Sequence, residues 1–123
     1  MYYTSIEQSK KLLELGLSPE SADNSWILSP VTNQYIRTAS RYDCDGDIPC
    51  WSVGALRNLI PVGLNFEDGT VLFRNHNRID GTWVYCFINA NDDVVKIQFT
   101  GSDLRAAYDM VVWLLENNYI KKD

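Results

Sequence analysis

The sequence predicts an α+β fold in which an antiparallel sheet packs against a long C-terminal helix. Asp68-Gly69 and Asp80-Gly81 separate β-prone runs in the last part of the chain, and Asp-Gly between such runs is a strong signal for a β-hairpin. An amphipathic segment follows these runs and begins after Ser102, a good N-cap residue. The 123 residues can bury a core of their own, so we predict a single domain over residues 1–123.

The N-terminal part is predicted to be helical. Ser5 and Gln8 fit a capping box, and Gly16 is suited to a left-handed stop, so a helix is expected over residues 6–15. Ser18 and Pro19 then favour a short second helix that reaches about residue 23.

The next part is predicted to contain a hairpin, a loop and a central helix. Residues 26–28 and 35–38 are short β-prone runs that could pair as a hairpin and extend the C-terminal sheet. Residues 41–49 are rich in aspartate and turn residues, which indicates a surface loop. A helix is expected over residues 53–60, because Ser52 can cap it, Trp51 and Leu56 fit a hydrophobic staple, and Pro61 ends it.

Residues 70–79, 82–89 and 94–100 are predicted to form an antiparallel three-stranded meander. In the last of these, Val95, Ile97 and Phe99 alternate with polar residues, which predicts one buried and one exposed face. The middle strand is apolar on both faces, so both could be covered. The C-terminal helix is expected over residues 103–117. The predicted core residues are Leu56, Leu59, Val84, Ile97, Val111 and Leu115.

Composition and charge disfavour several classes of protein. A net charge of -5 and a pI near 4.7 argue against direct binding to nucleic acid, whose phosphates would be repelled. The apolar stretches are shorter than the roughly 20 residues that cross a bilayer, and no signal-peptide pattern is present, so we expect a cytoplasmic protein without membrane contact. Its three cysteines are then expected to be reduced, although Cys44 and Cys50 are close enough in sequence for a disulfide.

Asp43, Asp45 and Asp47 alternate as carboxylates do at the start of a calcium loop. A small metal-dependent hydrolase could use such a loop. The loop pattern fails further on, because Ile48 stands where it requires Gly and Gly54 where it requires Glu. A solvated acidic loop is therefore the favoured interpretation, and no metal or other cofactor is expected.

The other reactive side chains also favour a non-enzymatic protein. His76 is the only histidine, and a metal-dependent nuclease would need a second one as base or ligand, so a polar strand residue is the better interpretation. Cys86 lies in an apolar run and is predicted to be a small core residue. The sequence contains no nucleophile elbow, phosphate-binding loop or dinucleotide-binding motif.

Aromatic residues give the most suggestive functional signal. Trp51, Trp83 and Trp113 are candidate interaction residues, because amphipathic aromatic side chains dominate protein interfaces. The alternative, which we favour for aromatic residues in general, is that they fill the core of a small domain. The leading functional hypothesis is a non-enzymatic interaction protein that binds an unidentified protein partner or a second copy of itself.

Three segments carry a resemblance to a known family: EQSKKLLELGL with the following residues to 23, PCWSVGAL with the following residues to 61, and WLLENNYIK at residues 113–121. They resemble a group of small uncharacterised proteins encoded in prophages and mobile elements of gut bacteria. The matching positions are caps, helix stops and apolar contacts. The resemblance therefore implies a shared framework and an accessory role in a mobile genetic element, and no established activity.

A third class of function is an acidic DNA mimic that inhibits a host DNA-binding enzyme. Such a mimic needs carboxylates spread along one face at the spacing of phosphates. Here the acidic residues are clustered at 43–47, 67–68 and 92–93, and 11 lysines and arginines lie among them. We therefore rank this hypothesis below a general interaction role.

Overall fold

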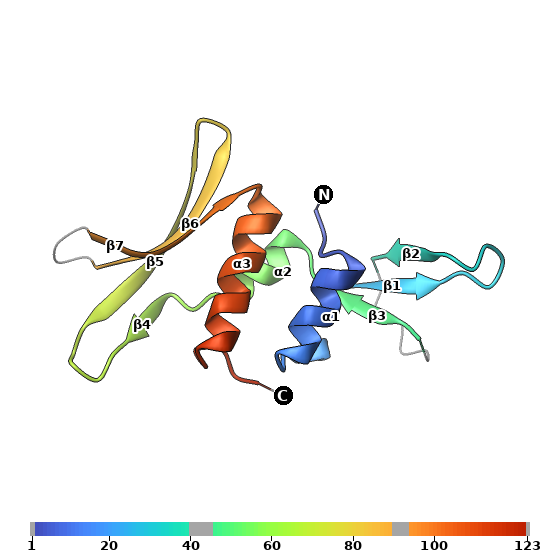
Figure 1. The fold of residues 1–123 in the computed structure, drawn as a ribbon, viewed down its shortest axis with the longest axis horizontal. Helices are drawn as coiled ribbons and strands as arrows, with labels where there is room; N and C mark the ends of the chain where they lie inside the picture. Colours follow the sequence, from blue (N-terminus) through green and yellow to red (C-terminus); the bar gives the residue numbers. More distant parts are fainter. Residues whose placement is uncertain (1, 40–45, 90–93, 123) are drawn as a thin grey trace.

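The computed structural model describes residues 2–39, 46–89 and 94–122, and in these residues three helices lie between two antiparallel sheets (Figure 1). The helices are α1 (Ile6–Glu14), α2 (Val53–Leu59) and α3 (Asp103–Glu116), and a short 3-10 helix, η1 (Pro19–Ser21), follows α1. The predicted α+β class is confirmed, and each predicted helix is present with bounds close to those expected.

The larger sheet has the strand order β4-β5-β6-β7, with all neighbours antiparallel. Its strands are β4 (Gly63–Asn65), β5 (Val71–Ile79), β6 (Thr82–Asn89) and β7 (Val94–Gly101). The last three strands are the predicted meander. Asp80 and Gly81, with φ of 50° and 81°, form the tight turn between β5 and β6, as the Asp-Gly pair predicts.

The smaller sheet corrects two predictions. β1 (Asn24–Leu28) and β2 (Tyr35–Thr38) form the expected hairpin, but its remaining partner is β3 (Ile48–Cys50), in the order β2-β1-β3. The hairpin therefore does not extend the C-terminal sheet, and residues 48–49 belong to a strand and not to a loop. Pro49 argued against a strand in the sequence, because proline has no amide to donate a hydrogen bond to a neighbouring strand. It is tolerated here because β3 is an edge strand.

Two helices end in the same hydrogen-bonded turn. After α1, Gly16 takes a left-handed φ of 97°, and the amide of Leu17 donates to the carbonyl of Leu12 at 3.0 Å. After α3, Asn118 has a φ of 62°, and the amide of Tyr119 donates to the carbonyl of Leu114 at 2.8 Å. These are Schellman motifs, which satisfy the last carbonyls of each helix and fold the following side chain back onto it.

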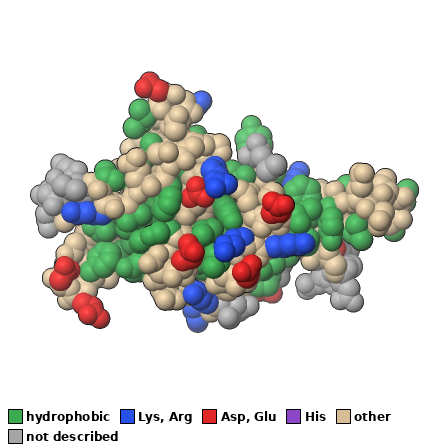
Figure 2. Space-filling view, in the orientation of Figure 1, with side chains coloured by type: hydrophobic (Ala, Val, Ile, Leu, Met, Phe, Trp, Pro, Cys, Tyr) green, Lys and Arg blue, Asp and Glu red, His purple; other side chains and the backbone are tan. Residues whose placement is uncertain are grey.

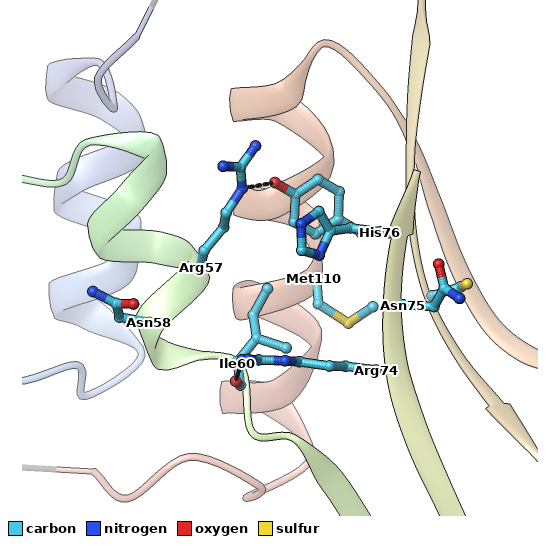
Figure 3. A pocket seen from close by; sticks show the side chains of 9 residues that line it. Arg57, Asn58, Ile60, Arg74, Asn75, His76 and Met110 are labelled. Atoms are coloured by element: carbon cyan, nitrogen blue, oxygen red, sulfur yellow. Dashed lines mark hydrogen bonds between the residues drawn. The ribbon is translucent and has the colours of Figure 1, made fainter. Parts of the chain in front are cut away.

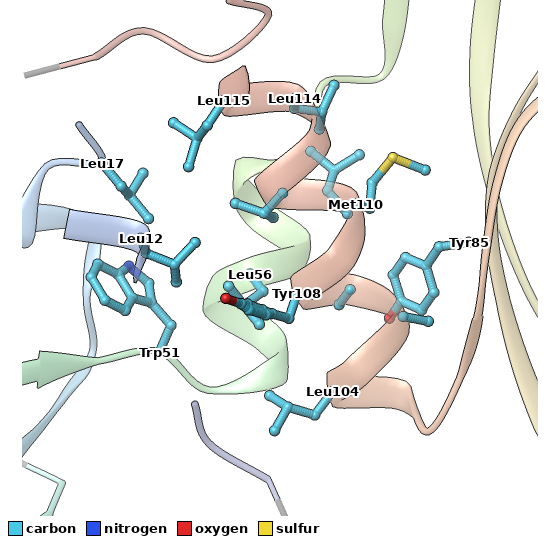
Figure 4. Close-up of a cluster of buried hydrophobic side chains, with 14 of the residues drawn as sticks. Leu12, Leu17, Trp51, Leu56, Tyr85, Leu104, Tyr108, Met110, Leu114 and Leu115 are labelled. Atoms are coloured by element: carbon cyan, nitrogen blue, oxygen red, sulfur yellow. The ribbon is translucent and has the colours of Figure 1, made fainter. Parts of the chain in front are cut away.

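The hydrophobic core lies where the three helices meet and continues onto β6 (Figure 4). Trp51 and Leu56, the predicted staple pair, are both fully buried. Of the predicted core residues, Leu56, Val111 and Leu115 are fully buried. Leu59 and Ile97 are partly buried and pack against the core.

Two predictions on the meander are wrong, and both concern the sheet face opposite α3. Val84 is only half-buried and lies on that face, whereas the neighbouring Tyr85 and Phe87 point into the core. Val95 is 46% exposed and does not share a face with Ile97. The register shifts at this point, because Phe87 pairs with Ile97 but Ile88 pairs with Val95. This β-bulge reverses the alternation that the sequence predicts.

Candidate functional site

A pocket of about 190 Å³ lies between α2, α3 and the helix-facing side of β5 (Figure 3). We call it the arginine pocket. Its lining residues come from four parts of the chain: Arg57, Asn58 and Ile60, then Arg74, Asn75 and His76, then Tyr85 and Cys86, and finally Met110.

The alternation of β5 places basic side chains beside this pocket. Residues two apart in a strand lie on one face, so Arg74, His76 and Arg78 point to the same side of the sheet. Their partners on β6 are Phe87, Tyr85 and Trp83, respectively. α3 packs mainly on β6 and β7, which leaves the basic side chains of β5 next to the helices and not beneath them.

Arg57 is held in place by a three-residue network. Its Nε donates to the Tyr85 hydroxyl at 2.6 Å, its guanidinium forms an ion pair with Asp103, and the Tyr85 hydroxyl itself donates to Asp103. The guanidinium carbon also lies 5.2 Å from the centre of the Trp83 ring, within the range of a cation–π interaction.

The network fixes the protonation states of Arg57 and Tyr85. Burial raises the pKa of Tyr85, and its hydrogen bond to Asp103 adds to the rise, to about 12. Burial alone would lower the pKa of Arg57, but its hydrogen bonds to Tyr85 and Asp103 raise it above the usual value. At neutral pH the pocket therefore presents a charged arginine, already neutralised by Asp103, and an uncharged tyrosine.

Arg74 differs from Arg57 because no acidic residue in the described part of the chain neutralises its charge. Its Nη1 donates to the carbonyl of Ile60 at 2.8 Å, and among the described residues it has no acidic partner within ion-pair distance. Figure 3 shows its side chain extended along one side of the pocket toward Ile60. No other described residue accepts from its guanidinium, so within this part of the chain the remaining donors can serve a ligand.

His76 forms one wall of the pocket. Its ring stacks on Tyr85, with 5.3 Å between ring centres and 22° between planes, and it also stacks on Trp83 at 6.3 Å. The side chain is exposed and lies in a strand, as predicted. The lining combines arginine donors with aromatic rings, so the arrangement is suited to binding an anionic group.

The three candidate tryptophans have different environments. Trp51 is fully buried, and its indole nitrogen donates to the Ser21 hydroxyl at 3.0 Å, so it offers no surface to a partner and the interface prediction does not fit it. Trp83 is half-buried beside the arginine pocket. Trp113 is half-buried and stacks on Tyr119 at 5.5 Å. A role in binding stays a prediction for Trp83 and Trp113.

The predicted acidic loop is described only in part. Asp43 and Asp45 lie outside the described residues, and Asp47 is half-buried just before β3. Within the described ranges, no three histidine, cysteine or acidic residues are grouped closely enough to hold a metal ion. The hypotheses of a hydrolase and a metal site at these aspartates are therefore not tested.

The described cysteines are buried, free thiols. Cys86 is a small buried residue, as predicted. Burial, and secondarily the charge of Asp23, raise the pKa of Cys50 to about 11, which makes it a poor nucleophile at neutral pH. Cys44, the residue close enough in sequence to pair with Cys50, lies outside the described residues.

A second, more open hollow of about 410 Å³ lies at the other end of the same sheet face. Phe66, Leu72 and Ile97 provide its apolar lining, with Asp68 and Lys96 at its border. Figure 2 shows a broad hydrophobic area over this part of the sheet, and acidic and basic side chains close to one another in the middle of the same view. On that face the acidic residues do not form the continuous array that a DNA mimic requires.

Comparison of the chain with protein-family models, curated proteins and solved structures finds no match. The resemblance to prophage and mobile-element proteins therefore stays a prediction. In the described part of the chain, no helix has both the length and the apolar character needed to span a bilayer.

Proposed function

We propose that this chain is a non-enzymatic protein-interaction module that binds an extended segment of another protein as an additional strand beside β5. The observation that carries this proposal is the free outer edge of β5. β4 covers that edge only as far as Phe73, and the amide of Arg74 makes the last contact, donating to the carbonyl of Val62 at 2.9 Å.

The backbone of β5 beyond this point is oriented to accept a strand. In a β-strand the backbone polar groups of alternate residues point to the same side. Because the Arg74 amide points away from β6, the amides and carbonyls of His76 and Arg78 also point outward, and within the described sheet no strand pairs with them. Such an edge can bind an extended peptide through main-chain hydrogen bonds.

Charge favours a foreign segment over a second copy of the chain. If two copies of β5 paired through this edge in antiparallel orientation, Arg74, His76 and Arg78 of one would face the same basic residues of the other. Like charges opposite each other destabilise a sheet, and charged edges are one means by which proteins avoid self-association. A partner segment that carries acidic residues would instead be attracted.

The proposal can be tested with peptides selected from a random displayed library for binding to the full chain. Binding is expected to slow hydrogen exchange at the amides of His76 and Arg78, followed by NMR. The amides of Asn75 and Asn77 point toward β6 and provide internal controls whose protection should change little.

A pair of variants separates the backbone from the side chain. Arg78→Pro removes one outward amide and is expected to abolish peptide binding, whereas Arg78→Ala keeps the amide and should retain most of it. Proline is tolerated at such an edge position, so both variants should fold. Failure to select any peptide, or protection at Phe66 and Ile97 in place of β5, would overturn the proposal, as would light scattering that shows β5-dependent dimers.

A further inference from the structure

We infer that the arginine pocket is a carboxylate-binding site that receives an acidic side chain of the segment bound beside β5. This inference rests on the proposed function and specifies the chemistry of the partner. It assigns Arg74 as the principal ligand-binding residue, with Arg57 and His76 completing the site.

The pocket adjoins the free edge. An added strand would lie about 4.8 Å from β5, and every second side chain of it would point to the helix-facing side of the sheet. On that side its nearest neighbours would be Arg74, His76 and Arg78. Arg74 and His76 line the pocket together with residues of α2, so we expect a side chain two or three bonds long to place its terminal group there.

The balance of charge favours a carboxylate over a phosphate. Arg57 is already paired with Asp103, so Arg74 supplies the only positive charge among the arginines of the pocket that is not neutralised by a described acidic residue. One unpaired guanidinium matches a carboxylate of charge −1 better than a phosphate monoester, whose charge is about −1.5 to −2 at neutral pH. The planar guanidinium also offers the parallel donors that a carboxylate accepts.

The rest of the site is arranged before a ligand binds. The interactions of Arg57 with Tyr85 and Asp103 hold it against the aromatic rings, and His76 stacks on the same rings. A ligand would therefore order few side chains other than Arg74, which reduces the entropic cost of binding.

Small molecules test the site independently of any peptide. Butyrate, inorganic phosphate and the uncharged butyramide are titrated while the Nε–Hε signals of the arginines are followed by NMR. Butyrate, a carboxylate of charge −1, is expected to shift the Arg74 signal in a saturable manner, and butyramide is not. Arg74→Gln should abolish the shift of the other pocket signals, Arg74→Lys should retain part of it, and Arg105→Gln, an exposed arginine on α3, is the matched control.

Selected peptides test specificity. They are expected to contain Asp or Glu at a fixed position, and changing that residue to Asn or Gln should weaken binding about tenfold or more, as loss of a charge-assisted hydrogen bond implies. In the Arg74→Gln protein the same change should have little effect. Peptides that protect the β5 amides without an acidic preference would overturn this inference alone, whereas butyrate binding without edge-binding peptides would overturn only the proposed function. Phosphate that binds more tightly than butyrate, or butyrate that leaves Arg74 unshifted, would overturn the carboxylate assignment.

Discussion

Thr4 is a small residue with a large structural role. It is fully buried, and each of its polar atoms has a partner. Its amide donates to the carbonyl of Trp51 at 2.9 Å, its hydroxyl accepts from the amide of Trp51 at 3.0 Å and contacts the Ser9 hydroxyl at 2.8 Å, and its carbonyl accepts from the indole of Trp26 at 3.0 Å. One residue thus joins the N-terminal segment to α1, β1 and the start of α2.

We predict that Thr4→Val lowers the free energy of unfolding by about 1–3 kcal/mol, the usual cost of leaving a buried polar group unsatisfied. Valine has the same shape, but it leaves the Trp51 amide and the Ser9 hydroxyl without their present partner. Urea denaturation measures the change. Thr100→Val, at an exposed position on β7, is the control and should be nearly neutral. Equal stability of the two variants would contradict this role of Thr4.

Tyr85 should titrate later than the other tyrosines. Burial and the hydrogen bond to Asp103 raise its pKa to about 12, against an ordinary value of 10.0. The folded state therefore holds this proton more tightly than the unfolded state, so the stability that it contributes is present below pH 10 and lost as the pH rises toward 12. In a spectrophotometric titration of the native protein, the tyrosinate step near pH 12 is expected to be missing in Tyr85→Phe, whereas the smaller rise in the pKa of Tyr108, caused by its burial, should remain. A single step that includes all tyrosines would argue against the network.

At the scale of single residues, the sequence predicted local chemistry well and the candidate site poorly. The side chains of Ser5, Ser52 and Ser102 cap helices as expected, because capping depends on residues three or four positions apart. Arg57 and Asp103 are 46 residues apart and meet only in the folded chain. The one feature of the sequence that pointed to the arginine pocket was the alternation of Arg74, His76 and Arg78 in a β-prone run of an acidic protein.

At the scale of elements, the length of each helix or strand determined whether the sequence predicted it. The long helices and strands have periodic patterns and clear caps, so they were found. β3 and β4 have three residues each, which is too few to show alternation, and both were missed. The bulge in β7 was also missed, because one inserted residue changes the face of its neighbours without changing their composition.

The packing of α3 gives a direct test at this scale. Leu115 is fully buried in the core near the C-terminal end of the helix. Leu115→Ala is expected to cost about 2–5 kcal/mol in a denaturation experiment, because it leaves a cavity that the surrounding helices can fill only in part. Leu28→Ala, at a position that is 45% exposed on β1, should cost much less. An unchanged denaturation midpoint for Leu115→Ala would show that α3 is not packed as described.

At the scale of the whole molecule, the two sheets do not pair with each other and are connected through the helices (Figure 1). Trp51 lies at this connection. It follows β3 directly, is fully buried, and belongs to the same core cluster as Leu12 of α1, Leu56 of α2 and Leu114 of α3. Figure 4 shows Trp51 beside Leu12 on one side of that cluster and Tyr85 of β6 on the other. A single cluster thus contains Trp51, next to the smaller sheet, and Tyr85 of the larger sheet. Loss of packing beside either sheet should therefore expose the remaining residues of the cluster to water.

We therefore predict that the chain unfolds as one cooperative unit, although its two sheets are separate. The 4 tryptophans are suitable probes when the protein is labelled with fluorotryptophan, since Trp26 reports on β1, Trp51 and Trp113 on the helical core, and Trp83 on β6. All four fluorine signals are expected to change at the same urea concentration and with the same slope, as in a two-state transition. Each signal can be assigned by a single tryptophan-to-phenylalanine substitution. A transition of Trp26 at lower urea would show that the β2-β1-β3 sheet unfolds on its own, and the chain would then consist of two units and not of the single domain that its sequence predicts.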